Sequence, residues 1–165
     1  MSPLDVDPIA TAQERWAGEG WHEAAPGMAA VTSVMRAQQL LSSRVDAALK
    51  PFGVTFARYE TLMLLRFSRR GSLPMSVISA RLQVHQSSVT NAVDRLEAAG
   101  LVTRVPHPGD RRTTLVAITS DGRRLTDEAT AVLNEQVFSR LEITGSDATE
   151  LTRILTRMRR DAGDF

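Results

Sequence analysis

Residues 72–119 read SLPMSVISARLQVHQSSVTNAVDRLEAAGLVTRVPHPGDRRTTLVAIT, and this stretch decides the fold. Within it, apolar side chains recur at the i, i+3, i+4 and i+7 spacing of one helical face: Val89, Ala92, Val93 and Leu96. The spacing predicts an α-helix whose apolar side packs against a core.

The opposite face of this helix is unusual in composition. It carries Ser87 and Asn91, flanked by Ser88, Thr90 and Arg95, where an ordinary exposed helix carries Glu, Lys and Arg. Short hydroxyl and amide side chains let a helix approach a hydrogen-bonding surface, and Asn can pair bidentately with adenine in the major groove. A solvated face that happens to be rich in Ser and Thr is the alternative, and this face alone leaves both open.

A shorter helix is predicted just before it. Pro74 suits a first helical position, and Met75, Ile78 and Leu82 form an apolar stripe. Residues 83–85 leave room only for a sharp turn, which is the spacing of a helix-turn-helix. An ordinary corner between two helices has the same pattern.

A β-hairpin is predicted after the second helix. Residues 101–105 and 113–118 are β-branched runs, joined by the turn-forming residues 106–112. A helix-turn-helix followed by such a ribbon is a winged helix. Arg112 at the tip could enter a narrow minor groove, with Asp110 orienting it through a charge-assisted bond. A charged surface loop is the alternative, but the preceding helix pair favours contact with DNA.

These features define a predicted DNA-binding surface. The hydroxyl and amide groups of the second helix would contact base edges or nearby phosphates, and Arg95, Arg104 and Arg111 would contact phosphates. The predicted set is Gln86, Ser87, Ser88, Thr90, Asn91, Arg95, Arg104, Asp110, Arg111 and Arg112.

The stretch HQSSVTNAVDRLEAAGLVTRVPHPGDRRTTLVAITSDG resembles the recognition helix and wing of the MarR family of bacterial transcription regulators. The resemblance covers residues 31–158 in element order and is specific over residues 73–122. Departures from the family pattern are Gln83 in place of a common Gly, Ile118 in place of Leu and Ser79 in place of Ala. The pattern is met by Ser87, Val89, Thr90, Val93, Asp94, Leu96, Glu97, Gly100, Leu101, Val102, Arg104, Asp110, Arg112, Thr119 and Gly122.

The resemblance implies a repressor that binds a palindromic operator as a homodimer formed by the first and last helices. It also implies a pocket for a small aromatic or amphipathic effector between the dimer helices and the DNA-binding lobe. Candidate lining residues are Met35, Arg36, Tyr59 and Met63, although core packing explains each of them more simply. The ligand-binding residues therefore stay unassigned.

Charge is distributed unevenly along the 165 residues. The net charge is only +1, but residues 58–124 carry +6, while residues 1–35 carry −4 and residues 125–165 carry −3. A basic centre with acidic flanks indicates one surface offered to phosphates. The absence of Cys excludes disulfides, thiolate metal sites and the cysteine-based peroxide sensors of the resembled family.

No apolar run approaches the roughly 20 residues of a membrane span, and the acidic N-terminus lacks the apolar core of a signal peptide. We expect a cytoplasmic protein with no membrane association. The sequence predicts no cofactor and no enzyme: the three His residues have no metal-ligand spacing, and nucleotide-binding and hydrolase motifs are absent. Ser87 and Ser88 lie near His85, but adjacent residues at a helix start rarely face each other.

The expected fold is mainly α with a small β-wing, a winged helix-turn-helix flanked by dimerisation helices. Residues 1–27 form an N-terminal arm with a short helix, and residues 28–57 contribute a long helix. Residues 58–122 form the DNA-binding lobe and residues 123–165 the C-terminal helices. The terminal helices cannot bury their apolar stripes on a small winged helix alone, which favours a dimer with two recognition helices. A winged-helix protein-interaction module without DNA readout is the alternative.

Overall fold

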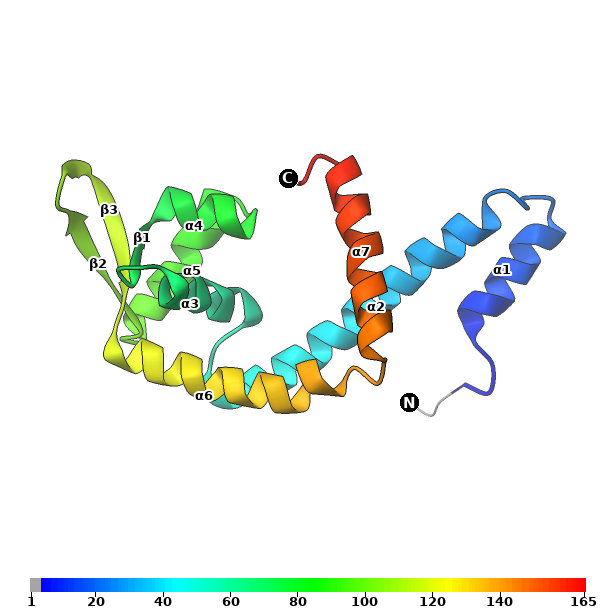
Figure 1. Ribbon diagram of the computed structural model, residues 1–165, viewed down its shortest axis with the longest axis horizontal. Helices are drawn as coiled ribbons and strands as arrows, with labels where there is room; N and C mark the ends of the chain where they lie inside the picture. Colours follow the sequence, from blue (N-terminus) through cyan, green and yellow to red (C-terminus); the bar gives the residue numbers. More distant parts are fainter. Residues whose placement is uncertain (1–3) are drawn as a thin grey trace. The chain divides into compact units, whose positions relative to one another are not determined.

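The computed structural model describes residues 4–165, except for the side chains of Arg111 and Arg112. It divides into two compact units, which meet in sequence between Phe56 and Ala57 (Figure 1). The predicted class, mainly α with a small β-wing, is confirmed. No helix in the described part of the chain is long and apolar enough to cross a membrane.

The N-terminal unit contains α1 (Pro8–Gly18), α2 (Ala25–Leu49) and the short 3₁₀ helix η1 (Lys50–Phe52). Asp7 caps α1, because its Oδ1 accepts the Ile9 N–H at 2.9 Å. α1 lies alongside α2 (Figure 1), and the rings of Trp16 and Trp21 pack edge to face with centroids 4.9 Å apart. The predicted short helix and long helix are therefore present, and the long helix begins three residues earlier than its apolar stripe at Met28 indicated.

The second unit holds the winged helix. Its helices are α3 (Phe56–Phe67), α4 (Met75–Leu82), α5 (Gln86–Ala98), α6 (Ser120–Gln136) and α7 (Gly145–Asp161), with the 3₁₀ helix η2 (Phe138–Arg140) after α6. Strands β1 (Ser72–Pro74), β2 (Val102–His107) and β3 (Asp110–Ile118) form one antiparallel sheet in the order β1-β3-β2. The core between helices and sheet is mostly apolar, and the hydroxyls of the two buried threonines, Thr61 and Thr126, donate to backbone carbonyl oxygens of their own helices. Its apolar side chains include Leu62, Leu65, Ile78, Val89, Val93, Leu96, Val116 and Leu133.

Strand β1 was not predicted. Ser72 pairs with Ala117 and Pro74 with Leu115, so three residues before α4 complete the sheet. Pro74 is extended, with φ −63° and ψ 147°, and occupies the N-cap position of α4 instead of the first helical position predicted for it. A three-residue strand is too short to show the alternation that marks strands in a sequence.

Helix α6 begins at Ser120, shortly after β3. The Thr119 hydroxyl accepts the Gly122 N–H at 3.0 Å and caps the helix. Gly122 is packed so tightly that a Cβ there would lie 2.1 Å from the Leu101 carbonyl oxygen. The helix ends at Gln136.

Helix α7 is amphipathic but has no buried residue. Thr144 caps it together with Asp147, and the hydrogen bond from the Thr144 hydroxyl lowers the pKa of the Asp147 carboxyl. The apolar side chains Leu151 and Met158 are 47% and 51% exposed. The apolar stripe of α7 is therefore exposed in the single chain.

Candidate nucleic-acid interface

The turn between α4 and α5 has a left-handed residue. Gln83 adopts φ 54° and ψ 39° and ends α4. This conformation explains why the resembled family often has Gly at this position, since Gly reaches positive φ without steric cost. The helix-turn-helix predicted from spacing is therefore formed, with Val84 and His85 completing the connection to α5.

Helix α5 separates its two faces as the sequence predicted. Val89, Val93 and Leu96 are at most 1% exposed, which fixes the rotation of the helix about its axis. The predicted contact residues on the other side are all exposed: Gln86, Ser87, Ser88, Thr90, Asn91 and Arg95. A helix held by a buried apolar face thus presents short polar side chains outward.

His85 caps α5 through its ring. The Ser87 N–H donates to His85 Nδ1 at 3.2 Å, and Ser87 Oγ lies 2.8 Å from the same nitrogen. The expectation that residues this close in sequence would not face each other was wrong here, because the extended backbone of His85 folds its ring over the first helical turn. The pair serves as a helix cap, and no cluster of metal-ligating side chains occurs among the residues described.

The wing is a longer ribbon with a tighter tip than predicted. Its strands run to His107 and from Asp110, so only Pro108 and Gly109 form the turn, and His107 Nδ1 accepts the Gly109 N–H at 3.1 Å. The pairing jumps from Pro106↔Thr114 to His107↔Asp110, which marks an irregularity in β3.

Asp110 Oδ2 accepts a hydrogen bond from Thr113 Oγ1 at 2.8 Å. The predicted roles of Arg111 at phosphates, of Arg112 in the minor groove and of Asp110 in orienting Arg112 depend on side chains that lie outside those described.

Arg104 joins the wing to the recognition helix. Its guanidinium in β2 forms ion pairs with Asp94 and Glu97 of α5, and its side chain is 28% exposed. The hydrogen bond with Asp94 is the main reason that the pKa of Arg104 lies above its ordinary value. The sequence predicted Arg104 as a phosphate contact, but in this structure two carboxylates already bind its charge.

The two carboxylates are functional residues that sequence reasoning left without a role. Asp94 and Glu97 belong to the matched family pattern, and their i, i+3 spacing places both on the side of α5 that faces β2. His85 was also missed as a cap, because N-caps are usually Ser, Thr, Asp or Asn.

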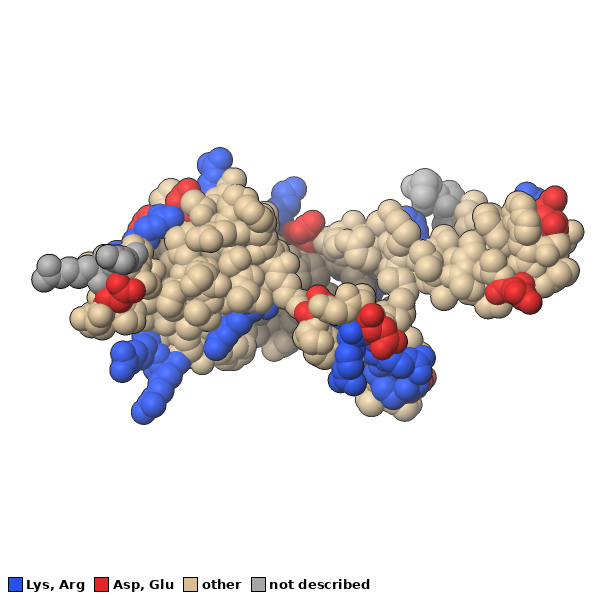
Figure 2. All heavy atoms as spheres, turned by 90° about the horizontal axis from the view of Figure 1, so that it is seen from above, with Lys and Arg blue, Asp and Glu red and all other residues tan. Residues whose placement is uncertain are grey.

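Basic side chains surround the lobe at several points. Figure 2 shows Lys and Arg side chains projecting from the molecule at several points. The sequence also places several arginines in α7, namely Arg153, Arg157, Arg159 and Arg160. Arg66 of α3 pairs with Asp127 of α6 at 3.3 Å. Arg69 and Arg70 remain exposed at the end of α3.

The candidate effector residues in the second unit have structural partners. Tyr59 is 5% exposed and its hydroxyl lies 2.9 Å from Thr130 Oγ1. The Thr130 hydroxyl also lies 3.6 Å from Met63 Sδ, which accepts from it. Core packing therefore accounts for both. Met35 is 61% exposed, and Arg36 Nη1 donates to Gln39 Oε1 at 3.2 Å on the surface of α2.

Known proteins with this arrangement are transcription regulators. The MarR family model matches residues 52–113. Sco5413, a MarR family transcriptional regulator from Streptomyces coelicolor, is 50% identical, with a TM-score of 0.76 over 85% of this chain and 97% of its own. The chain also spans 54% and 66% of the length of two curated relatives, both HTH-type transcriptional regulators.

Two further solved structures are of bound forms. Sco3205 of Streptomyces coelicolor, in complex with DNA, is 25% identical with a TM-score of 0.70, over 80% of this chain and 85% of its own. CouR of Rhodococcus jostii, bound to p-coumaroyl-CoA, is 28% identical with a TM-score of 0.66, over 75% and 86% of the two chains. This chain has a winged helix, matches the MarR family model and is 50% identical to Sco5413, of which it covers 97%. It therefore belongs to the MarR family of transcriptional regulators.

Proposed function

We propose that the protein binds double-stranded DNA sequence-specifically and regulates transcription. The observation that carries this proposal is the outward face of α5, where Ser87, Ser88, Thr90 and Asn91 are exposed beside a basic wing. These side chains are short enough to let the helix enter a major groove and read base edges. The DNA complex of Sco3205, which has the same fold, supports the proposal.

The remaining contacts position the helix on the duplex. We assign Arg95 and Arg111 to phosphates and Arg112 to the minor groove, with Asp110 orienting Arg112. Gln86 completes the set at the start of α5. Arg104 stays a candidate phosphate contact, but its ion pairs favour a role in holding the wing against α5.

A homodimer is part of the proposal. The apolar residues Val31 and Met35 of α2, and Leu151 and Met158 of α7, are exposed in the single chain, and burying them between two copies would remove this surface from water. We therefore keep residues 28–57 and 123–165 as dimerisation regions and 58–122 as the DNA-binding lobe, with residues 1–27 as an added arm. A two-fold dimer presents two recognition helices to a palindromic operator with half-sites about 10 base pairs apart.

We further propose that the protein is a cytoplasmic repressor released from DNA by a small aromatic or amphipathic effector. CouR bound to p-coumaroyl-CoA supports this idea for a relative. An effector that favours a dimer with misplaced recognition helices would lower operator affinity through a population shift. This action needs binding only and no catalysis, in keeping with relatives that are transcriptional regulators.

Selection of bound sequences from random duplexes tests the proposal. We expect a palindromic motif, a dimer by sedimentation, and an affinity that falls steeply with salt as counterions are released. A chain that binds no duplex at low ionic strength, but captures a protein partner through the same lobe, would instead support the interaction module.

A further inference from the structure

The hydroxyl groups on α5 differ in which hydrogen bonds they can still make. Ser87 Oγ lies 2.8 Å from His85 Nδ1, and Thr90 Oγ1 donates to the Gln86 carbonyl oxygen at 3.0 Å. Ser88 makes no side-chain hydrogen bond within the described part of the chain. A hydroxyl has one hydrogen and two lone pairs, so its inward bond decides what it can offer outward.

The direction of the His85–Ser87 bond follows from the cap. The Ser87 amide donates to His85 Nδ1, and an amide N–H can only donate, so this nitrogen carries no proton. With Nδ1 unprotonated, the Ser87 hydroxyl 2.8 Å away is the donor, and its hydrogen shares the single lone pair of Nδ1 with the amide hydrogen. Neutral His85 carries its proton on Nε2.

Ser87 and Thr90 therefore both donate their hydroxyl hydrogens within the protein, Ser87 to His85 Nδ1 and Thr90 to the Gln86 carbonyl oxygen. Only lone pairs remain on the side of these residues that faces away from the helix. In the major groove, adenine N6 and cytosine N4 are donors, whereas guanine and thymine present acceptors there. A hydroxyl that can only accept matches adenine or cytosine and opposes guanine or thymine.

We propose that His85 is a specificity-determining residue, which makes Ser87 an acceptor and so selects an amino-bearing base, adenine or cytosine, at the position Ser87 contacts. This inference rests on the proposed sequence-specific DNA binding. His85 acts through Ser87 and need not touch DNA, so it is a positioning residue.

Random-duplex selection with the full chain and four variants tests the inference. For the wild type we expect a roughly threefold to tenfold preference for adenine or cytosine at one half-site position, the size of one hydrogen bond. Ser87→Ala should abolish that preference, and Ser139→Ala, at an exposed serine outside the predicted DNA-binding surface, is the matched control and should leave it unchanged. His85→Ala frees the Ser87 hydroxyl hydrogen and should admit guanine and thymine at this position only.

His85→Asp separates the effect of hydrogen-bond direction at Ser87 from the effect of losing the helix cap. Aspartate is a strong N-cap and accepts hydrogen bonds without donating, so it should keep the adenine or cytosine preference even if its charge lowers overall affinity. A purely structural role for His85 would change affinity in these variants without changing the base at one position.

Three results would overturn the inference: guanine or thymine at the position that depends on Ser87, no position that depends on Ser87, or an unchanged preference in His85→Ala. If His85→Ala does not fold, the ¹⁵N spectrum of wild-type His85 shows which ring nitrogen carries the proton. A protonated Nδ1 in neutral histidine would contradict the inference. If the wild-type protein bound no duplex at all, the proposed function itself would be contradicted. A normal operator motif with guanine or thymine at the Ser87 position would contradict only the role of His85.

Discussion

Glu97 of α5 binds Arg104 of β2 at two points. Its Oε1 accepts the Arg104 backbone N–H at 2.9 Å, while its Oε2 pairs with the Arg104 guanidinium. Backbone and side chain of one wing residue are thus held by one carboxylate of the recognition helix, and Asp94 adds a second ion pair. The wing and the helix are therefore mechanically linked at the base of the ribbon.

Glu97→Ala should loosen this link. We expect a loss of about 1 kcal/mol in the free energy of unfolding, because the pair is partly solvated and only the backbone N–H loses a shielded partner. Urea denaturation measures the loss, and faster amide exchange in β2 would locate it. Glu150→Ala removes a fully exposed pair with Arg153 and serves as the control. Equal midpoints for the two variants would show that the Glu97 link contributes nothing.

Gly122→Ala should destabilise the second unit. The added methyl would lie 2.1 Å from the Leu101 carbonyl and 2.9 Å from Ile118 Cγ1, so backbone must move to admit it. We expect a cost of about 1–3 kcal/mol, as for other overpacked sites. Gly145→Ala, at a glycine with open space around it, is the matched control. A thermal midpoint like that of wild type would mean that the α6 start moves more freely than this packing implies.

Asn91→Ala should relax base preference at one operator position. The loss of a bidentate contact costs roughly 1–3 kcal/mol per half-site. Sequence selection on the variant measures the change, with the exposed Asn134→Ala on α6 as a control that keeps the motif. Recovery of the wild-type motif by both variants would remove Asn91 from the readout.

Arg112→Ala should weaken binding to all sequences and lower the salt dependence. One lost cation near phosphates reduces the slope of log affinity against log salt by about 1. Arg124→Ala makes the same change of charge on α6, where Arg124 pairs with Asp121 at 2.9 Å. If the two variants have identical slopes in titrations at several salt concentrations, Arg112 does not contact the duplex.

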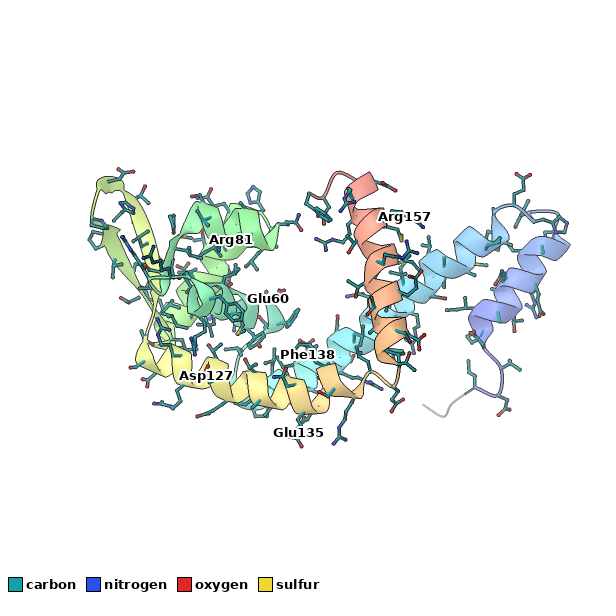
Figure 3. All side chains as sticks on the ribbon, in the orientation of Figure 1. Glu60, Arg81, Asp127, Glu135, Phe138 and Arg157 are labelled. Carbon is teal, nitrogen blue, oxygen red and sulfur yellow. The ribbon has the colours of Figure 1, made fainter. Side chains whose placement is uncertain are left out.

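Glu60→Gln should raise the stability of the protein at neutral pH. Burial on α3 raises the pKa of the Glu60 carboxyl, so the folded state disfavours its ionised form (Figure 3). The unfolded chain has the lower pKa, so stability falls as pH rises through the unfolded and then the folded value. Glutamine removes this cost at pH 7 and leaves stability unchanged below both pKa values.

The expected rise in thermal midpoint for Glu60→Gln is below the roughly 2–4 °C that 1 kcal/mol produces in a protein of this size. Parallel melts at neutral and acidic pH, with the exposed Glu135→Gln as control, measure it. A gain that persists in acid would have a cause other than ionisation.

Periodicity determined the helices of the lobe. The i, i+3, i+4 and i+7 spacing of Val89, Ala92, Val93 and Leu96 placed α5 and its buried face, and Thr119, a residue type common at N-caps, precedes α6 as its cap. These features are local, because helix faces and caps depend on residues within one or two turns of the chain.

Only the tertiary structure decided the contacts between elements that lie apart in sequence. β1 forms because Ser72–Pro74 reach β3 across some forty residues of chain, and Arg104 meets Glu97 because the ribbon folds back onto α5. The cap at His85 also depended on a backbone angle that no propensity indicates. Sequence patterns predict which face of a helix or strand is apolar. The partner of a given side chain instead depends on which other helix or strand the tertiary fold packs against it.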